Sequence, residues 1–165
     1  MLEVREGRRQ VYLRAFVGVD VVRRVLLRET ARRPGTGDDP VRRIYVAGHW
    51  PARYRLRTEV ARLRSAGNDV RATWMDQETD DGDPAGEATR DLAEIQRAEV
   101  LIVDTLSEDC TGGREFEAGF AHAIGRVVYI VGPARNVFHR LARERWGTWD
   151  EAFSSGRFGD PVPRR

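Results

Sequence analysis

The sequence predicts an α/β fold: a flavodoxin-like or Rossmann-like parallel sheet of four to five strands with helices on both faces. From Arg43 onward, short apolar runs alternate with amphipathic segments of about 10–15 residues, a pattern typical of βαβ units. Crossovers between parallel strands are right-handed, so the helices can cover both faces of the sheet. The length of 165 residues suits one domain with a hydrophobic core.

The first half of this pattern begins with a buried strand, expected over 43–48, where the sequence is RIYVAG. A helix is expected over about 52–66, because apolar residues recur on one face at i, i+4 and i+7: Leu56, Val60 and Leu63. This helix should end at Gly67-Asn68, since both residue types tolerate a left-handed conformation.

The second half repeats the alternation. DVRATWM, residues 69–75, is expected as a strand because Val70, Ala72 and Trp74 alternate. The remaining elements are expected as an acidic loop over 76–88, a helix over 88–98, a strand over 100–105, a helix over about 114–125 and a strand over 127–132.

The two ends of the chain differ from this pattern. Residues 1–40 end in a turn-rich linker and carry no recognisable chemistry, so we expect an appended element of unknown role. The main α/β domain is expected over 41–155, and a flexible tail over 156–165. Trp146, Trp149 and Phe153 indicate a short C-terminal helix that packs aromatic side chains.

Composition argues against several function classes. The formal charge of +2 is nearly balanced, and no apolar run approaches the roughly 18 residues of a membrane span. We therefore expect a cytoplasmic protein without a membrane or nucleic acid polymer as partner. All 28 basic residues are arginine, which excludes Schiff-base and phosphate-loop lysines.

No metal or nicotinamide cofactor is expected. The single Cys110 allows no internal disulfide, and neither it nor the three histidines show metal-ligand spacing. The first strand is followed by AGHWPAR, which lacks the G-x-G-x-x-G pattern of dinucleotide-binding folds.

The loop after the third predicted strand is the most informative one, because ligands bind beyond the carboxyl ends of parallel strands. Thr111, Gly112 and Gly113 form a turn before a helix that begins with Glu115 and Glu117. A helix N-terminus favours carboxylates and bound phosphate. The two glutamates point to different helix faces, and Glu117 is the better catalytic candidate because small residues follow it. The alternative is an acid that only stabilises the helix.

Asp91 is expected to open the preceding helix. There it either caps the helix or supplies a second carboxyl to the same crevice. Glycosidic cleavage with retention uses two carboxyls about 5 Å apart, one that attacks the anomeric carbon and one that handles the proton of the leaving group. The sequence leaves both interpretations of Asp91 open.

Four segments together resemble the nucleoside 2-deoxyribosyltransferase family, which includes the 2′-deoxynucleoside 5′-monophosphate N-hydrolases. They are IYVAGHW, RDLAEIQRAEVLIVD, GGREFEAGFAHAIGRVVYIVG and NVFH, and the resemblance covers roughly residues 43–150. The most specific piece, EAGFAHAIGR, is similar to the family's E-L-G-x-A-x-A-x-G-K helix. The resemblance implies that Glu117 is the nucleophile, that Asp91 assists at the base and that Tyr45 orients Glu117.

The resemblance also implies substrate contacts. Gly48 and Trp50 follow the first strand, where Trp50 would stack on the base. Asn136 would reach the 5′ end of the substrate in a neighbouring subunit, which implies a homodimer or larger homo-oligomer. Tyr45, Trp50 and Asn136 each keep a structural alternative: a core aromatic, a surface indole and a turn-forming asparagine.

The position six residues before the nucleophile separates two branches of that family. Transferases that act on free nucleosides tend to carry aspartate there, whereas this chain has Thr111, closer to the hydroxyl residue with which the monophosphate hydrolases contact phosphate. Gly112, Gly113, Arg53 and Arg114 would also suit a 5′-phosphate. These features favour a nucleoside 5′-monophosphate as substrate.

The sequence thus predicts an enzyme that cleaves or transfers the N-glycosidic bond of a (deoxy)nucleoside or its 5′-monophosphate through a covalent glycosyl-Glu117 intermediate. Two alternatives remain: a non-catalytic nucleotide-binding or signalling module of the same fold, and an NAD-type glycohydrolase that also uses a glutamate. The base, the sugar and the choice between hydrolysis and transfer stay open.

Overall fold

The computed structural model describes residues 42–77, 83–108 and 112–159. Its strands are β1 (Arg43–Ala47), β2 (Asp69–Arg71), β3 (Val100–Asp104), β4 (Val127–Val131) and β5 (Glu144–Trp146). Its α-helices are α2 (Arg53–Ser65), α3 (Pro84–Arg97), α4 (Gly113–Ala123) and α5 (Trp149–Ser154), and its 3₁₀ helices are η1 (Trp50–Ala52), η2 (Thr73–Asp76) and η3 (Val137–Leu141). The predicted extension over 1–40 lies outside the described residues.

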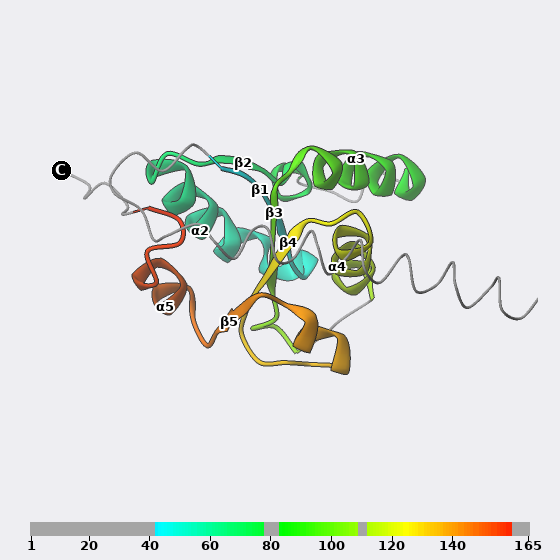
Figure 1. Ribbon diagram of the computed structural model, residues 1–165. Helices are drawn as coiled ribbons and strands as arrows, with labels where there is room; N and C mark the ends of the chain where they lie inside the picture. The colour runs from blue at the N-terminus through cyan, green and yellow to red at the C-terminus, as the bar shows by residue number, and fades with distance from the viewer. Residues whose placement is uncertain (1–41, 78–82, 109–111, 160–165) are drawn as a thin grey trace, which may run out of the picture. The chain divides into compact units, whose positions relative to one another are not determined.

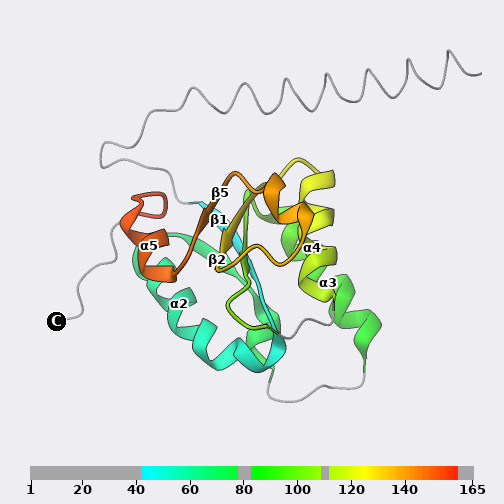
Figure 2. The ribbon, with the colours of Figure 1, turned by 90° about the horizontal axis from the view of Figure 1, so that it is seen from below.

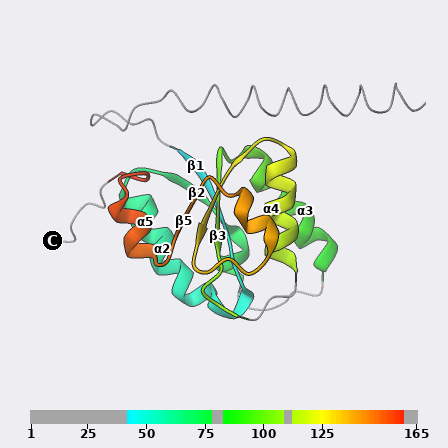
Figure 3. The same cartoon turned by 60° about the horizontal axis from the view of Figure 1, so that its bottom comes forward.

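The described strands form one parallel sheet in the order β2-β1-β3-β4-β5. Helices α2 and α5 lie on one face and α3 and α4 on the other (Figure 1), an arrangement also seen in Figures 2 and 3. The predicted fold class is therefore confirmed, and the strand order is the flavodoxin-like one.

The core lies around the two central strands. β1 and β3 are apolar almost throughout and buried on both faces, which is typical of parallel strands covered by helices on each side. Helix α2 buries the face predicted from its periodicity, with Leu56, Val60 and Leu63 all in the core. Among the described residues, no helix has the length and apolar character needed to cross a membrane.

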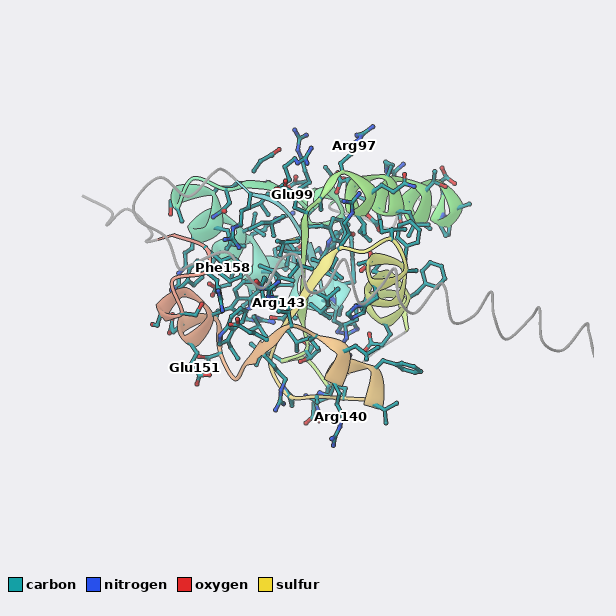
Figure 4. The ribbon with its side chains drawn as sticks, in the orientation of Figure 1. Arg97, Glu99, Arg140, Arg143, Glu151 and Phe158 are labelled. Carbon is teal, nitrogen blue, oxygen red and sulfur yellow. The ribbon has the colours of Figure 1, made fainter. Side chains whose placement is uncertain are left out.

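The C-terminal segment adds a fifth strand and an aromatic cluster. Trp146 of β5 packs on Tyr129 of β4, with ring centroids 5.1 Å apart. Phe158, labelled near α5 in Figure 4, is 2% exposed and lies 5.7 Å from both rings. The sequence predicts a flexible tail from residue 156, yet the chain packs on the core through Phe158; residues 160–165 lie outside the described part.

The second strand is shorter than the sequence predicts. β2 ends at Arg71, and the expected continuation to residue 75 is the 3₁₀ helix η2. The Trp74 indole donates from Nε1 to the backbone oxygen of Val46 at 2.9 Å, which anchors this segment on the end of β1. Beyond Arg71, the alternation of apolar residues therefore reflects burial of Ala72 and Trp74 and not strand pairing.

The next helix begins earlier than the sequence predicts. α3 starts at Pro84 and not at residue 88, inside the stretch expected to be a loop. The side chain of Asp83 caps it by accepting a hydrogen bond from the backbone N–H of Gly86 at 3.0 Å. Pro84 suits the first helical position, where a missing N–H leaves no bond unmade.

Candidate active site

A cavity of about 260 Å³ lies at the carboxyl edge of the sheet. Successive connections leave β1 and β3 towards opposite sides of the sheet, and open α/β sheets bind ligands at this switch point. Among the residues predicted for the site, six line the cavity: Gly48, Trp50, Asp91, Gly113, Arg114 and Glu117.

Glu117 and Asp91 line the cavity from neighbouring helices. α4 carries Glu117 and α3 carries Asp91, and the two helices lie side by side on one face of the sheet (Figures 1 to 3). The hydroxyl of Tyr45 on β1 donates to Glu117 Oε1 at 2.9 Å, although the two residues are 72 positions apart. The same hydroxyl lowers the pKa of Asp91, so it also lies near that carboxyl. The three predicted catalytic side chains therefore lie together around the Tyr45 hydroxyl.

The carboxyl of Glu117 has a strongly shifted pKa. Burial raises the pKa from 4.5 to about 8, and the negative charges of Asp91 and Glu115 add to this shift. The hydrogen bond from Tyr45 acts in the opposite direction. No arginine or histidine in the described part of the chain forms an ion pair with Glu117, so no cation counteracts the burial.

The neighbouring groups are shifted in the same direction. Burial raises the pKa of Asp91 from 3.8 to about 6; the hydrogen bond with Tyr45 lowers it, and the charges of Glu94 and Glu87 raise it. Burial and the nearby carboxylates hold the pKa of Tyr45 well above its usual value, so its hydroxyl keeps its proton. Between pH 6 and 8 the two carboxyls therefore carry about one proton between them.

Asp91 does not open its helix, contrary to the sequence-based expectation. It is the eighth residue of α3, and Asp83 provides the cap. The capping alternative for Asp91 is therefore wrong. The extra N-terminal turn of α3 places Asp91 in the middle of the helix, on the side that lines the cavity.

Two indoles and a glycine form the wall of the cavity next to β1. The rings of Trp50 and Trp74 lie 6.3 Å apart at an angle of 39°. The guanidinium of Arg53 lies 4.2 Å from the centre of the Trp50 ring and donates to the Trp50 backbone oxygen, which fixes the orientation of the indole. A Cβ at Gly48 would lie 2.5 Å from Leu56 Cδ1, so close packing on α2 requires glycine there.

The start of α4 has the predicted turn geometry. Gly112 is the N-cap with φ 90°, a left-handed conformation that favours glycine, and no side chain caps the helix there. A Cβ added at Gly113 would meet nothing within 4 Å, so there is space beside this residue. Thr111, predicted to contact substrate, lies outside the described residues.

Glu115 and Glu117 point in different directions, as their spacing predicts. Glu115 accepts hydrogen bonds from Arg114 Nε at 3.1 Å and lies 3.5 Å from His139 Nε2. His139 is buried, and burial lowers its pKa, so the ring is neutral near pH 7. Glu115 thus connects α4 to η3, whereas Glu117 lines the cavity.

Asn136 does not line the cavity. It is the N-cap of η3, and its side-chain oxygen accepts from the backbone N–H groups of Phe138 at 2.9 Å and His139 at 3.2 Å. This is the geometry of the turn-forming alternative. A contribution of Asn136 to a neighbouring subunit stays a prediction.

Four further residues line the cavity without having been predicted from the sequence: His49, Trp74, Gln77 and Glu87. Glu87 and Asp91 are four residues apart on α3 and therefore share a face. Because the sequence predicts a loop over 76–88, it does not predict that Glu87 and Asp91 share a helix face. Within the described ranges, no three histidine, cysteine, aspartate or glutamate side chains gather as a metal site would require.

The chain is similar in fold to a solved enzyme. This is a 2-deoxyribosyltransferase from the psychrotolerant bacterium Bacillus psychrosaccharolyticus, which is 18% identical, with a TM-score of 0.57. The match covers 73% of this chain and 98% of that enzyme. No protein-family model matches the sequence, and no curated protein matches it either. The similarity supports the fold, and the function has to be argued from the cavity.

Proposed function

We propose that this protein cleaves or transfers the N-glycosidic bond of a (deoxy)nucleoside or nucleotide, with Glu117 as the nucleophile. The observation that carries the proposal is the pair of partly buried carboxyls, Glu117 and Asp91, which line one cavity, with the Tyr45 hydroxyl bonded to Glu117 and near enough to Asp91 to lower its pKa. Perturbed carboxyls in a cleft are typical of catalytic sites. The similarity in fold to a 2-deoxyribosyltransferase agrees with this chemistry.

The first step forms a glycosyl ester. Tyr45 engages Glu117 Oε1, which leaves Oε2 to attack C1′ of the sugar. The C1′–N bond breaks, and its electron pair stays on the base nitrogen. That nitrogen takes the proton shared by the two carboxyls, delivered from Asp91. The Trp50 and Trp74 indoles provide apolar surface for the flat base.

The second step releases the sugar. In hydrolysis, water attacks C1′, the ester bond to Glu117 breaks, and Asp91 takes the proton from the water. In transfer, a second base attacks in the same way and gives its proton to Asp91. Both outcomes regenerate the Glu117 carboxylate, and both retain the configuration at C1′.

Tyr45 supports both steps through its position between the carboxyls. Near pH 7 Glu117 favours the protonated form and Asp91 the charged form, because the pKa of Glu117 is about 8 and that of Asp91 about 6. Attack on C1′ requires the opposite arrangement. The Tyr45 hydroxyl can accept from one carboxyl and donate to the other, so the proton can move to Asp91 when substrate binds.

We also propose that the protein is a homo-oligomer. Large apolar side chains on α4 and η3 are exposed in the described chain: Phe116, Val137, Phe138 and Leu141. α4 and η3 lie next to each other, joined by the contact between Glu115 and His139. Asn136 begins η3, so a second copy seated on this surface would meet the residue predicted to reach a neighbouring site.

The proposed function is tested by incubating the protein with deoxynucleosides, ribonucleosides, their 5′-monophosphates and NAD, with and without an acceptor base. Chromatography then measures the released base, any new nucleoside and nicotinamide. Base release that depends on Glu117 supports the proposal. Binding without release points to a non-catalytic nucleotide module, and nicotinamide release alone points to an NAD glycohydrolase.

A further inference from the structure

Glu87 is an acid of the carboxyl-edge cavity that takes no part in the proposed reaction steps. It lies in the first turn of α3, is half-buried and lines the cavity together with Asp91. No arginine or histidine of the described chain forms an ion pair with it. A carboxylate can accept about four hydrogen bonds and donates none. Most of the acceptor capacity of Glu87 is therefore available to a ligand in the cavity.

The side chain of Gln77 holds Glu87 in place. With its amide oriented to suit both neighbours, Gln77 donates to Glu87 Oε1 at 3.2 Å and accepts from Arg90 Nη2 at 3.0 Å. Gln77 directly follows η2 and also lines the cavity. The backbone N–H of Thr73, at the start of η2, donates to Glu94 on α3 at 3.1 Å, which ties the two elements together. The Glu87 carboxylate is therefore oriented before a ligand arrives, which favours binding.

The direction of α3 determines where Glu87 lies relative to the reacting groups. Asp91 lines the carboxyl-edge cavity, whereas Glu94 lines a second cavity at the amino edge, so Glu87 lies on the outer side of Asp91. Four residues of α-helix correspond to about 6 Å along the axis. This is of the order of the distance from the glycosidic nitrogen of a purine to its opposite edge. A purine whose glycosidic bond lies between Glu117 and Asp91 can therefore present that edge to Glu87.

A carboxylate at this position distinguishes the bases by their donors. Guanine presents N1–H and its 2-amino group side by side, and the two oxygens of one carboxylate can accept from both. Adenine and cytosine present an amino group beside a ring nitrogen that is itself an acceptor. Uracil and thymine present one N–H between two carbonyl oxygens. An acceptor that faces a carboxylate oxygen is repelled, so Glu87 favours guanine over the other four bases.

We infer that Glu87 selects a guanine base by accepting hydrogen bonds from its N1–H and 2-amino groups. This inference rests on the proposed function and names the base of its substrate. Glu87 is then a specificity-determining residue, and Gln77 is the residue that positions its carboxylate. The Trp50 and Trp74 indoles line the same cavity and contact the flat face of the base, which carries no information about its edge.

The experiment compares kcat/KM for guanine and hypoxanthine deoxynucleosides and their 5′-monophosphates, because these two bases differ only in the 2-amino group. The wild type should prefer guanine by at least about tenfold, the size of one charge-assisted hydrogen bond. Glu87→Gln replaces one acceptor by a donor, so the preference should fall below about threefold. Glu94→Gln is the matched control: in addition to burial, the charges of Glu94 and Glu87 both raise the pKa of Asp91, but only Glu87 lines this cavity. The control should leave the guanine preference unchanged.

A binding measurement separates failure of this inference from failure of the proposed function. Calorimetry on Glu117→Gln, which removes the nucleophile, measures the affinity for the deoxynucleoside 5′-monophosphates of guanine, hypoxanthine, adenine, cytosine and uracil, with and without Glu87→Gln. Tightest binding of the guanine nucleotide that is lost with Glu87→Gln supports the inference even if no base is ever released. Equal affinity for guanine and hypoxanthine, tighter binding of another base, or a guanine preference that survives Glu87→Gln overturns it and leaves the proposed function in place.

Discussion

The two edges of the sheet carry cavities of similar volume with very different electrostatics. The amino-edge cavity measures about 240 Å³ and is lined by arginines and acids from β1, β2 and α3. Its charges are exposed and paired: Arg43 lies 3.3 Å from Glu99, and Arg71 lies 3.2 Å from Asp69. Figure 4 labels Glu99 near this edge.

The carboxyl-edge cavity measures about 260 Å³, but two of its acids, Glu117 and Asp91, lie partly buried near each other. Glu117 and Asp91 lie near the Tyr45 hydroxyl, form no salt bridge in the described chain, and have pKa values raised to about 8 and 6. The two cavities therefore do not differ in volume or in the presence of charged residues. They differ because the carboxyl-edge cavity holds desolvated, unpaired acids. Such groups reduce stability and are typical of a functional site.

The largest expected effect is on turnover. Glu117→Gln should reduce base release by about 10³-fold or more, because a covalent route passes entirely through this carboxylate. Asp69→Asn, at the other cavity, is the matched control and should leave the rate unchanged. Glu115→Gln should retain substantial activity. Loss of activity with Glu115→Gln but not with Glu117→Gln would place the site elsewhere.

The next expected effect is on the pH profile. If the singly protonated carboxyl pair is the active form, kcat/KM should be bell-shaped with limbs near pH 6 and 8. Asp91→Asn should lower the rate by about 10²-fold and remove the alkaline limb. The same variant removes a negative charge near Glu117 and so lowers the pKa of this carboxyl, whereas Tyr45→Phe removes a hydrogen bond and raises it.

These two variants are matched because both act on Glu117 and should shift its titration in opposite directions. Titration of Glu117 followed by carbon NMR on labelled protein measures the shift directly. Shifts of the same sign would mean that the carboxyl pair is not coupled through Tyr45. A rate that keeps rising above pH 8 in the wild type would remove Asp91 as proton donor.

A smaller effect is expected on stability. The folded pKa of Glu117, about 8, lies above its ordinary value of 4.5, so the folded protein binds an extra proton between these pH values. The free energy of unfolding therefore falls as pH rises from about 4.5 to 8. Glu117→Gln removes this decrease in the free energy of unfolding. The variant should therefore be more stable than the wild type by about 1–3 kcal/mol at pH 8.5, and by less at pH 5.5.

Urea unfolding at the two pH values measures this difference. Glu99→Gln, whose partner Arg43 is exposed, should change stability by less than about 0.5 kcal/mol at either pH. If Glu117→Gln is destabilising at pH 8.5, the carboxyl is not a buried, unpaired acid.

The smallest effect on catalytic activity is expected from changes in self-association. Phe138 is 70% exposed on η3, and Phe138→Asp should weaken self-association, because a charge on an apolar interface is unfavourable. Light scattering should show a dimer or larger species for the wild type and a smaller species for the variant. Tyr54→Asp, an exposed aromatic on α2, is the control. A fully active wild-type monomer would exclude an interface between copies.

The elements predicted from the sequence are those with strong local signals. The apolar runs at β1, β3 and β4 and the periodicity of α2 are correct, because burial repeats within a few residues along the chain. The start of α3 was missed although Asp83 and Pro84 carry a helix-start signal, since the neighbouring acids suggested a loop. β5 has only three residues, which is too short for a recognisable alternation.

For the site, the sequence by itself determined that the two glutamates at the start of α4 face different ways. Two residues of separation place Glu115 and Glu117 on different faces of any helix, and Gly112 marks where the helix begins. These are local consequences of 3.6 residues per turn. Only the tertiary structure decided what surrounds Glu117.

Tyr45 reaches Glu117 across 72 positions, and the pKa shifts follow from burial by other elements. Likewise, the buried Nη2 of Arg114 has no hydrogen-bond partner because no acceptor from another segment lies close enough to it. Sequence patterns report neighbours within about four residues, whereas desolvation and hydrogen-bond satisfaction depend on every segment that packs around a group.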